Sequence, residues 1–401
     1  MTTATIETVA TPDWADFPTE EYQARVAKAQ RSMREHGLEV LMLTQKENVQ
    51  YFSGFLCGHW SAKTFATAIL LIHVTKDPVL VLPDFFAGTA RGSSWIQQHA
   101  YFTEPHAQPR RSADAIVEAV TALAGPSAVI GLEWGQNLVA SWNLADYHKV
   151  RERLGAATFK SGEEVVWACR MIKSSREIER LREITAITER AMVEARGQLH
   201  AGLTEQDLAR TTAASGMRAG ADGIAFTNIR SGLERYRMAD SVPMDRPIRA
   251  GEMVVFDIGL TLRTYTSDIA YNTHIGPPTA KHHDIWRNMI KAQDTALALM
   301  RPGVSAREVF EGCHQVLADY GYGRLIDMVG HAIGLDVHEP PILAPYDERT
   351  LEPGMVFALE PWVYDIEGLG VFALEEMVVI TEDGSQLLST LPRDEIWSTG
   401  A

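Results

Sequence analysis

The segment from Val254 to Tyr271, VVFDIGLTLRTYTSDIAY, holds two acidic residues within otherwise apolar, β-type sequence. Asp257 and Asp268 are placed symmetrically about Leu262-Arg263, so a reversal there predicts a β-hairpin with the two carboxylates as cross-strand neighbours on one face. An ionised carboxylate on a buried strand loses much of its solvation unless a cation compensates it. The segment therefore predicts a buried anionic site.

A second segment, Val356 to Glu376, VFALEPWVYDIEGLGVFALEE, repeats this arrangement. Its centre falls at Glu367-Gly368, which sets Glu360 opposite Glu375 in the same way. Two hairpins thus present two carboxylate pairs. Four clustered acids require cations close by.

The segment GHAIGLDVHEPP, from Gly330 to Pro341, supplies His331 and His338, with glycines that allow close backbone approach. One imidazole with four carboxylates makes a mainly oxygen-ligand site, which suits Mn²⁺, with Fe²⁺, Co²⁺ or Zn²⁺ as further candidates. Two divalent ions would balance the four carboxylates. They would also ease the deprotonation of a water between them and stabilise the oxyanion formed when that water attacks a carbonyl.

A weak internal repeat precedes the acidic hairpins. In each copy a glycine ends a helix, and a Thr or Ser with an acid three residues later begins the next one. The two copies are Glu177–Gln198 with Gly202 and Thr204, and Ile285–Met300 with Gly303 and Ser305. On the helices alone this common chemistry could be coincidence, but each copy also runs into a hairpin that carries two acids. We therefore expect two related halves that face one another.

The first part of the chain has a different character. After a polar leader, residues 1–17, a helix over Thr19–Glu35 precedes several apolar β-type runs that alternate with helical stretches. This pattern predicts a mixed α/β domain over residues 18–164. A long charged helix then opens the second domain, residues 165–401.

Composition narrows the classes of function. The 401 residues are 46% hydrophobic and 22% charged, which is typical of globular proteins. The net charge of −15 offers no basic patch for nucleic acid. Three cysteines without a CxxC pattern argue against disulfides or a thiolate zinc site, and no signal peptide or run of 18 apolar residues occurs. We expect a cytoplasmic protein with neither nucleic-acid nor membrane partners.

Residues 165–392 resemble the catalytic domain of the "pita-bread" superfamily, which contains methionine aminopeptidases, proline-specific dipeptidases, aminopeptidase P and creatinase. Residues 18–160 resemble the N-terminal domain of its creatinase and prolidase branch. The resemblance implies an α/β N-terminal domain plus an α+β pita-bread domain with a pseudo-twofold repeat. The motifs that carry it are Asp257-x-Gly259, Tyr265-x-Ser-Asp268, Gly330-His331-x-x-Gly-Leu-x-x-His338-Glu339-Pro, Leu351-Glu-Pro-Gly-Met355 and Glu360-Pro361.

This resemblance also implies roles and an activity. Glu360 would double as a proton shuttle, and His338 would hydrogen-bond the substrate or the developing tetrahedral intermediate. The family pattern selects Glu375 over Glu376 as a ligand. The implied activity is Xaa-Pro dipeptidase-like or aminopeptidase-like hydrolysis of a small amide or dipeptide-like substrate by a metal-bridging hydroxide. The implied ligands of two metal ions are Asp257, Asp268, His331, Glu360 and Glu375.

Three departures surround the implied pocket. Asp240 stands where peptidases of this family carry a substrate-contacting histidine, while Tyr271 and Ala373 stand where arginine is common. Neutral drift or a one-residue register error is one explanation. The other is a specialised non-peptidase, either a C–N hydrolase like creatinase or ectoine hydrolase, or an enzyme like dimethylsulfoniopropionate lyase. A metal-free binding protein is a third alternative, which four buried acids disfavour.

The loop Asn48–Lys63 resembles the one that creatinase-type enzymes extend over a neighbouring subunit's active site. Its His59, Trp60 and Lys63 would contact the substrate by stacking and charge, as Asp240 and Tyr271 would from the catalytic domain. The resemblance thus implies a homodimer. The alternative is a strand-end loop with Trp60 packed in the local core.

Overall fold

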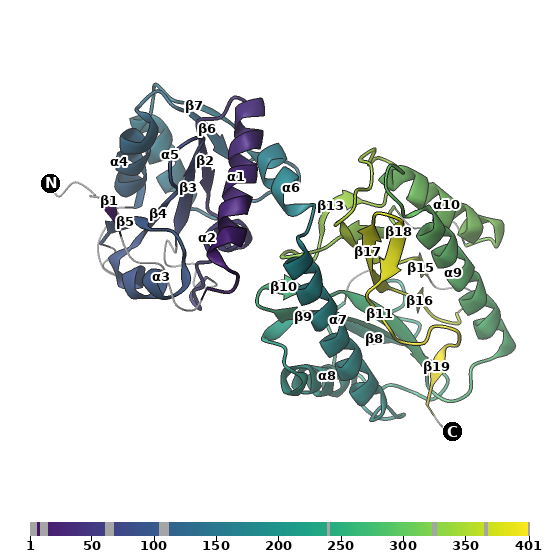
Figure 1. The fold of residues 1–401 in the computed structure, drawn as a ribbon. Helices are drawn as coiled ribbons and strands as arrows, with labels where there is room; N and C mark the ends of the chain where they lie inside the picture. The colour runs from purple at the N-terminus through teal and green to yellow at the C-terminus, as the bar shows by residue number, and fades with distance from the viewer. Residues whose placement is uncertain are drawn as a thin grey trace. The chain divides into compact units, whose positions relative to one another are not determined.

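The computed structural model describes residues 6–8, 15–60, 68–103, 112–238, 241–322, 327–364 and 368–399. It divides into two compact units, Met1–Arg170 and Met171–Ala401 (Figure 1). The expected boundary between residues 164 and 165 lies within helix α6 (Glu163–Arg170), which the structure groups with the N-terminal unit.

The N-terminal unit is a mixed sheet with helices on its faces. Its strands are β1 (Ile6–Thr8), β2 (Val40–Leu43), β3 (Ile69–His73), β4 (Val79–Pro83), β5 (Gln98–Phe102), β6 (Val129–Leu132) and β7 (Thr158–Ser161). Its helices are α1 (Thr19–Glu35), α2 (Lys46–Ser53), the 3₁₀ turn η1 (Asp84–Phe86), α3 (Ala87–Ser93), α4 (Ser112–Ala124), α5 (Leu144–Arg153) and α6.

The sheet has the order β1-β5-β4-β3-β2-β6-β7. Helices α4 and α5 lie on one side of it, and α1 and α6 on the other (Figure 1). Strands β2, β3 and β4 are buried along their whole length, because both faces are covered, and this explains why they are apolar runs without polar alternation. The α/β character expected of this part is confirmed.

The described residues of the C-terminal unit form four long helices and two principal sheets. The helices are α7 (Ser175–Arg196), α8 (Glu205–Ala219), α9 (Ala280–Leu299) and α10 (Ala306–Asp319). The strands are β8 (Gly223–Ser231), β9 (Met253–Leu262), β10 (Tyr265–Thr266), β11 (Ile269–His274), β12 (Gly330–Ala332), β13 (Glu339–Ile342), β14 (Val356–Leu359), β15 (Trp362–Val363), β16 (Phe372–Ala373), β17 (Glu376–Thr381), β18 (Gly384–Leu387) and β19 (Trp397–Ser398).

The two halves of this unit repeat one another. One sheet runs β10-β9-β11-β19 with β8 paired to β9, and the other runs β13-β12-β14-β17-β18. At the glycine between the two helices of each half, Gly202 N donates to Ile248 O at 2.8 Å and Gly303 N donates to Leu351 O at 2.9 Å. An isolated bridge follows in both copies, Thr204 to Pro247 and Ser305 to Thr350. The predicted internal repeat is confirmed, together with its two cap residues.

The first acidic hairpin differs in register from the expectation. Arg263 and Thr264 adopt positive φ angles of 48° and 73° and form the turn, so Leu262 pairs with Tyr265. Asp257 consequently pairs with Ala270, not with Asp268. Because this moves the pairing by two residues, the side-chain faces are unchanged, and both acids still lie on one face.

The second hairpin has the expected register. Leu359 pairs with Glu376, and Trp362 pairs with Ala373. Glu360 and Glu375 lie opposite one another between these two short ladders, each just outside a strand. Its expected centre includes Glu367, which lies outside the described residues.

Helix α9 begins earlier than the predicted Ile285. Thr279 accepts from the backbone N–H of His282, and the His282 ring bonds back to Thr279, so the histidine completes a reciprocal cap. His282 is buried and contacts the rings of His274 and Phe372. His282 is therefore a packed capping residue. Among the described residues, no helix combines the length and apolar character needed to cross a bilayer.

Candidate metal centre

Five side chains expected to bind metal come together in the C-terminal unit. Asp257 lies within β9, and His331 lies in the middle of β12. Asp268 immediately precedes β11, Glu375 precedes β17, and Glu360 follows β14. Three of the four carboxylates thus lie just outside a strand, where the side chain is not constrained by a ladder.

The distances within this cluster are those of groups that share a small space. His331 Nε2 lies 3.2 Å from Glu360 Oε1 and 3.6 Å from Asp268 Oδ2. Ligand atoms of Asp257, Asp268 and Glu375 lie within 4.8 Å of one another, as do those of His331, Glu360 and Glu375. Each group has the size and chemistry of a set of metal ligands.

Polar atoms in the cluster are buried without a hydrogen bond of good geometry among the described residues. They are Asp257 Oδ1, Asp268 Oδ1, His331 Nε2, Glu360 Oε1 and both carboxylate oxygens of Glu375. Buried polar atoms are almost always satisfied in native proteins, since leaving one unpaired costs about 1–3 kcal/mol. A group of neighbouring oxygen and nitrogen atoms without hydrogen bonds is what a site for divalent metal ions requires. Four carboxylates and one imidazole are enough ligands for two such ions.

The protonation of the metal-free cluster leads to the same conclusion. Burial, followed by the neighbouring carboxylates, raises the pKa of Asp257 and of Glu375 well above the usual range. Burial alone would lower the pKa of His331, but the carboxylates of Asp268 and Glu360 outweigh it and raise that pKa to about 10. The metal-free centre therefore retains protons that divalent ions would displace.

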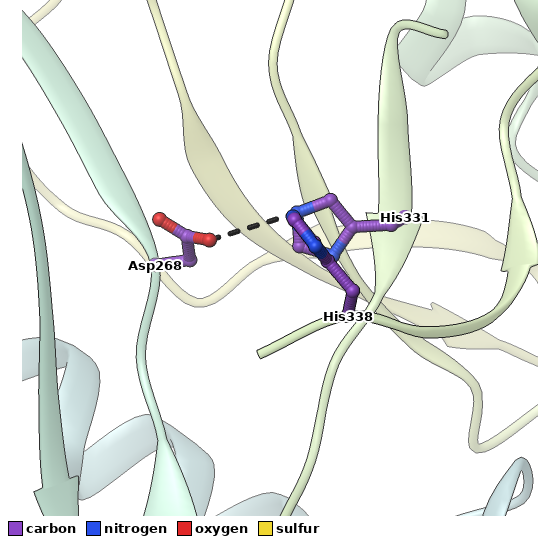
Figure 2. A group of neighbouring side chains, drawn as sticks. All are labelled: Asp268, His331 and His338. Carbon is purple, nitrogen blue, oxygen red and sulfur yellow. Dashed lines mark ion pairs between the residues drawn. The ribbon is translucent and has the colours of Figure 1, made fainter. Parts of the chain in front are cut away.

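His338 lies beside the cluster and is the accessible member of the group. Its ring packs edge-on against His331 with centroids 4.0 Å apart, and Figure 2 shows both imidazoles on the same side of Asp268. Partial removal from water and the adjacent His331 lower the pKa of His338 to about 4. A neutral, accessible imidazole next to the buried acids is suited to hydrogen-bonding a substrate.

Hydrogen bonds behind the cluster connect the two acidic hairpins. Glu375 N donates to Ala270 O at 2.8 Å. The amide of Asn272 on β11 donates to Val371 O at 2.8 Å and accepts from Ala373 N at 2.6 Å. These bonds connect the strand that follows Asp268 directly to the strand that leads into Glu375, so the two acids cannot separate without breaking them.

Tyr271 does not lie where the sequence suggested. It is fully buried, its hydroxyl donates to Glu376 at 3.2 Å, and its ring stacks on Trp397 with centroids 4.8 Å apart. Tyr271 is three residues from Asp268, and side chains an odd number of residues apart on a strand point to opposite faces. The expected substrate contact at Tyr271 is corrected accordingly. Glu376 therefore lies on the face of Tyr271, while Glu375 lies with the other proposed metal ligands.

The remaining positions expected to contact substrate are distributed differently. Asp240 and Lys63 lie outside the described residues. His59 and Trp60 belong to the N-terminal unit, where His59 is exposed and lies 6.0 Å from the ring of Phe86. Trp60 packs edge-on against Phe55 at 5.9 Å.

Two residues that contact the cluster, and a third that lies behind them, were not predicted from the sequence. Asn228 Nδ2 donates to Asp257 Oδ2 at 2.9 Å, and Trp362 Nε1 donates to Glu360 Oε2 at 2.8 Å. Behind Asn228 lies Arg230, which is completely buried. The alternation Asn228-x-Arg230 within a strand, and a tryptophan directly after Glu360-Pro361, were the available signals.

Comparison with known families identifies the scaffold. Residues 179–382 match the model of metallopeptidase family M24, and residues 25–172 match the creatinase/prolidase N-terminal domain. The chain belongs to metallopeptidase family M24. The M24 assignment agrees with the resemblance to the creatinase and prolidase branch, and it makes the protein a metal-dependent hydrolase.

Relatives of this M24 chain match between about three fifths and nearly the whole of its length. The Xaa-Pro dipeptidase of Pyrococcus horikoshii is 27% identical over 373 residues, which cover 93% of this chain and 98% of that protein. The Xaa-Pro dipeptidase of Pyrococcus furiosus is 32% identical over 245 residues, 61% of this chain and 70% of that protein. The X-Pro aminopeptidase structure from Thermotoga maritima superposes with a TM-score of 0.79 at 26% identity, covering 93% and 99% of the two chains.

Proposed function

We propose that this M24 enzyme hydrolyses the peptide bond of Xaa-Pro dipeptides or closely related small amides. The observation that carries the proposal is the set of buried carboxylate oxygens that lack a hydrogen bond of good geometry among the described residues. The Xaa-Pro dipeptidases and the X-Pro aminopeptidase that resemble this chain over most of their length support the substrate class.

The proposed metal ligands are Asp257, Asp268, His331, Glu360 and Glu375, which would hold two divalent ions, with Mn²⁺ favoured by the oxygen-rich set. When bound, these ions would supply Lewis acidity for the attack of water on the scissile carbonyl. Glu360 accepts the proton of the attacking water and returns it to the leaving amine, a role that suits a carboxylate at the rim of the cluster. His338 donates a hydrogen bond to the oxyanion that develops on the carbonyl.

The proposal extends to assembly and location. A homodimer would allow His59, Trp60 and Lys63 of one subunit to contact substrate in the partner's active site, as the resemblance of this loop to creatinase-type enzymes suggests. The indole Nε1 of Trp60 is buried without a hydrogen-bond partner among the described residues, which is consistent with a loop that gains contacts in an assembly. Three free cysteines support a reducing, cytoplasmic location.

The test is a substrate panel with Mn²⁺-reconstituted protein. The panel combines Xaa-Pro dipeptides, dipeptides without proline, longer Xaa-Pro peptides, creatine, ectoine and dimethylsulfoniopropionate. Selective cleavage of Xaa-Pro dipeptides is the expected result. Turnover of one of the three non-peptide compounds with no cleavage of any peptide would refute the proposal and favour the specialised enzyme suggested by the departures at Asp240 and Ala373.

A further inference from the structure

Strand β8 places a pair of polar residues directly behind one of the acids. Asn228 is the cross-strand partner of Asp257, and Arg230 follows two residues later on the same face of the strand. Arg230 is completely buried, and Asn228 is nearly so. The Arg230 Nη1 donates to Asn228 Oδ1 at 2.5 Å, and Asn228 Nδ2 donates to Asp257 Oδ2 at 2.9 Å.

The donors and acceptors in this chain of hydrogen bonds can be assigned in only one way. A guanidinium has donors and no acceptor, so it fixes the oxygen of the Asn228 amide toward itself and turns the NH₂ group toward Asp257. Asp257 therefore receives a hydrogen bond on Oδ2, which favours its ionised form, while Oδ1 remains directed into the cluster without a bond among the described residues. The protein thus hydrogen-bonds one oxygen of Asp257 and leaves the other facing the cluster of proposed metal ligands.

The same guanidinium supports a second acid through a different residue. The Cζ of Arg230 lies 5.3 Å from the ring centroid of Trp362, a cation–π distance. The indole Nε1 of Trp362 donates to Glu360 Oε2 at 2.8 Å, and Glu360 Oε1 faces His331. Here too one oxygen is held and the other is presented.

We propose that Arg230 is a positioning residue that sets the orientation of Asp257 through Asn228 and of Glu360 through Trp362, and thereby determines the affinity of the centre for divalent metal. This inference rests on the metal ligands named under the proposed function. Groups that orient metal ligands typically change affinity by about 10- to 100-fold when they are removed.

The positive charge of Arg230 and its positioning role predict opposite effects on the affinity for metal. A buried cation repels divalent ions, so if only its charge mattered, Arg230→Met would tighten metal binding. If Arg230 positions the ligands, the same substitution weakens binding. Arg230→Lys keeps the charge but lacks the planar guanidinium that donates to Asn228 and lies over the Trp362 ring at the same time, so its metal binding should remain weakened.

The experiment is a titration of metal-free protein with Co²⁺, followed by its visible absorption, in competition with a chelator of known affinity. Arg230→Met and the charge-neutral Asn228→Leu should each weaken binding by about 10- to 100-fold. The matched control is Arg235→Met, which removes another buried arginine of the same unit, paired with Glu205 at 3.1 Å. It should lower the melting temperature without changing the affinity.

Failure of the positioning role of Arg230 and failure of the proposed metal centre would give different results. Unchanged or tighter Co²⁺ binding by Arg230→Met, or full recovery by Arg230→Lys, would overturn the positioning role while leaving the metal centre intact. Asn228→Leu keeps the arginine, so it tests the Asp257 arm even if Arg230→Met does not fold. Failure of the unsubstituted protein to bind Co²⁺ would overturn the proposed centre itself and this inference with it.

Discussion

The Nε2 atom of His331 lies 3.6 Å from Oδ2 of Asp268, although the two residues belong to different halves of the repeat. His331 lies in β12 and Asp268 immediately precedes β11, and no strand ladder within the described parts of the chain joins the sheets of these two strands. Hydrogen bonds made by Asn272 and by the backbone of Glu375 connect the two acidic hairpins, one from each half. The geometry of the centre thus depends on the interface between the two halves. A change in the packing of either half should therefore alter the distances between the proposed ligands.

Metal removal should make stability depend on pH. Asp257 and Glu375 have raised pKa values in the folded metal-free protein, so that protein binds more protons than the unfolded chain above about pH 4. His331, with a pKa of about 10, acts in the same direction above its unfolded pKa. The free energy of unfolding of chelated protein should therefore fall as pH rises from about 7 to 8.5, above the range in which His338, with its lowered pKa, has the opposite effect.

Denaturant unfolding with Mn²⁺ and with chelator at both pH values checks this. We expect the stabilisation by Mn²⁺ to be larger at the higher pH, since fewer protons must then be displaced. Equal stabilisation at the two values would contradict the account of a proton-holding cluster.

His338→Ala should separate catalysis from metal binding. The imidazole packs against His331 but has its own access to solvent, so its loss removes a substrate hydrogen bond and leaves the five proposed ligands. We expect kcat to fall by about 100- to 1000-fold, as for other donors to a developing oxyanion, with unchanged metal content. Loss of metal together with activity would instead place His338 among the ligands, an arrangement that its proximity to Asp268 and His331 makes worth excluding.

Asp240→His should increase the hydrolysis of Xaa-Pro dipeptides. Asp240 lies outside the described residues, so this prediction comes from the sequence: an anion at that position repels the carboxylate of a dipeptide and cannot donate a hydrogen bond while ionised. The measurement is kcat/KM on one Xaa-Pro dipeptide for both proteins. A value above about 10⁴ M⁻¹s⁻¹ for the unsubstituted enzyme would mean that Asp240 is no barrier.

Subunit complementation tests the proposed role of the N-terminal loop. Trp60→Ala and Glu360→Ala should each be inactive, but mixed dimers should contain one site with both residues intact. Partial recovery of activity after mixing, with subunit exchange verified by mass spectrometry, is the expected result. Sedimentation as a monomer at assay concentration, or exchange without recovery, would remove the basis for a shared site.

The candidate ligands could be predicted because acids within apolar strands are costly and therefore conspicuous in a sequence. The register of the second hairpin followed from symmetry alone, and the structure confirms it. The register that symmetry predicted for the first hairpin was wrong. Arg263 and Thr264 form the turn with positive φ angles, which residues other than glycine seldom adopt. Nothing in the local sequence indicated a turn at that position.

Other residues could not be placed because their roles depend on tertiary neighbours. Tyr271 was assigned by its separation from Asp268, yet strand alternation turns it to the opposite face, where Glu376 and Trp397 receive it. Asn228 becomes a neighbour of Asp257 only through the pairing of β8 with β9, which is separated from it by a long connection. A strand's partner is a property of the fold, and sequence alternation reveals only its faces.

The central claim is a centre that holds two divalent metal ions. Elemental analysis after loading with Mn²⁺ and removal of the excess tests it most directly, with Glu375→Ala and Glu376→Ala as a matched pair of adjacent acids. The account predicts about two ions per unsubstituted chain and per Glu376→Ala chain, and about one or fewer for Glu375→Ala. Metal near zero in the unsubstituted protein, or full occupancy in Glu375→Ala, would contradict it.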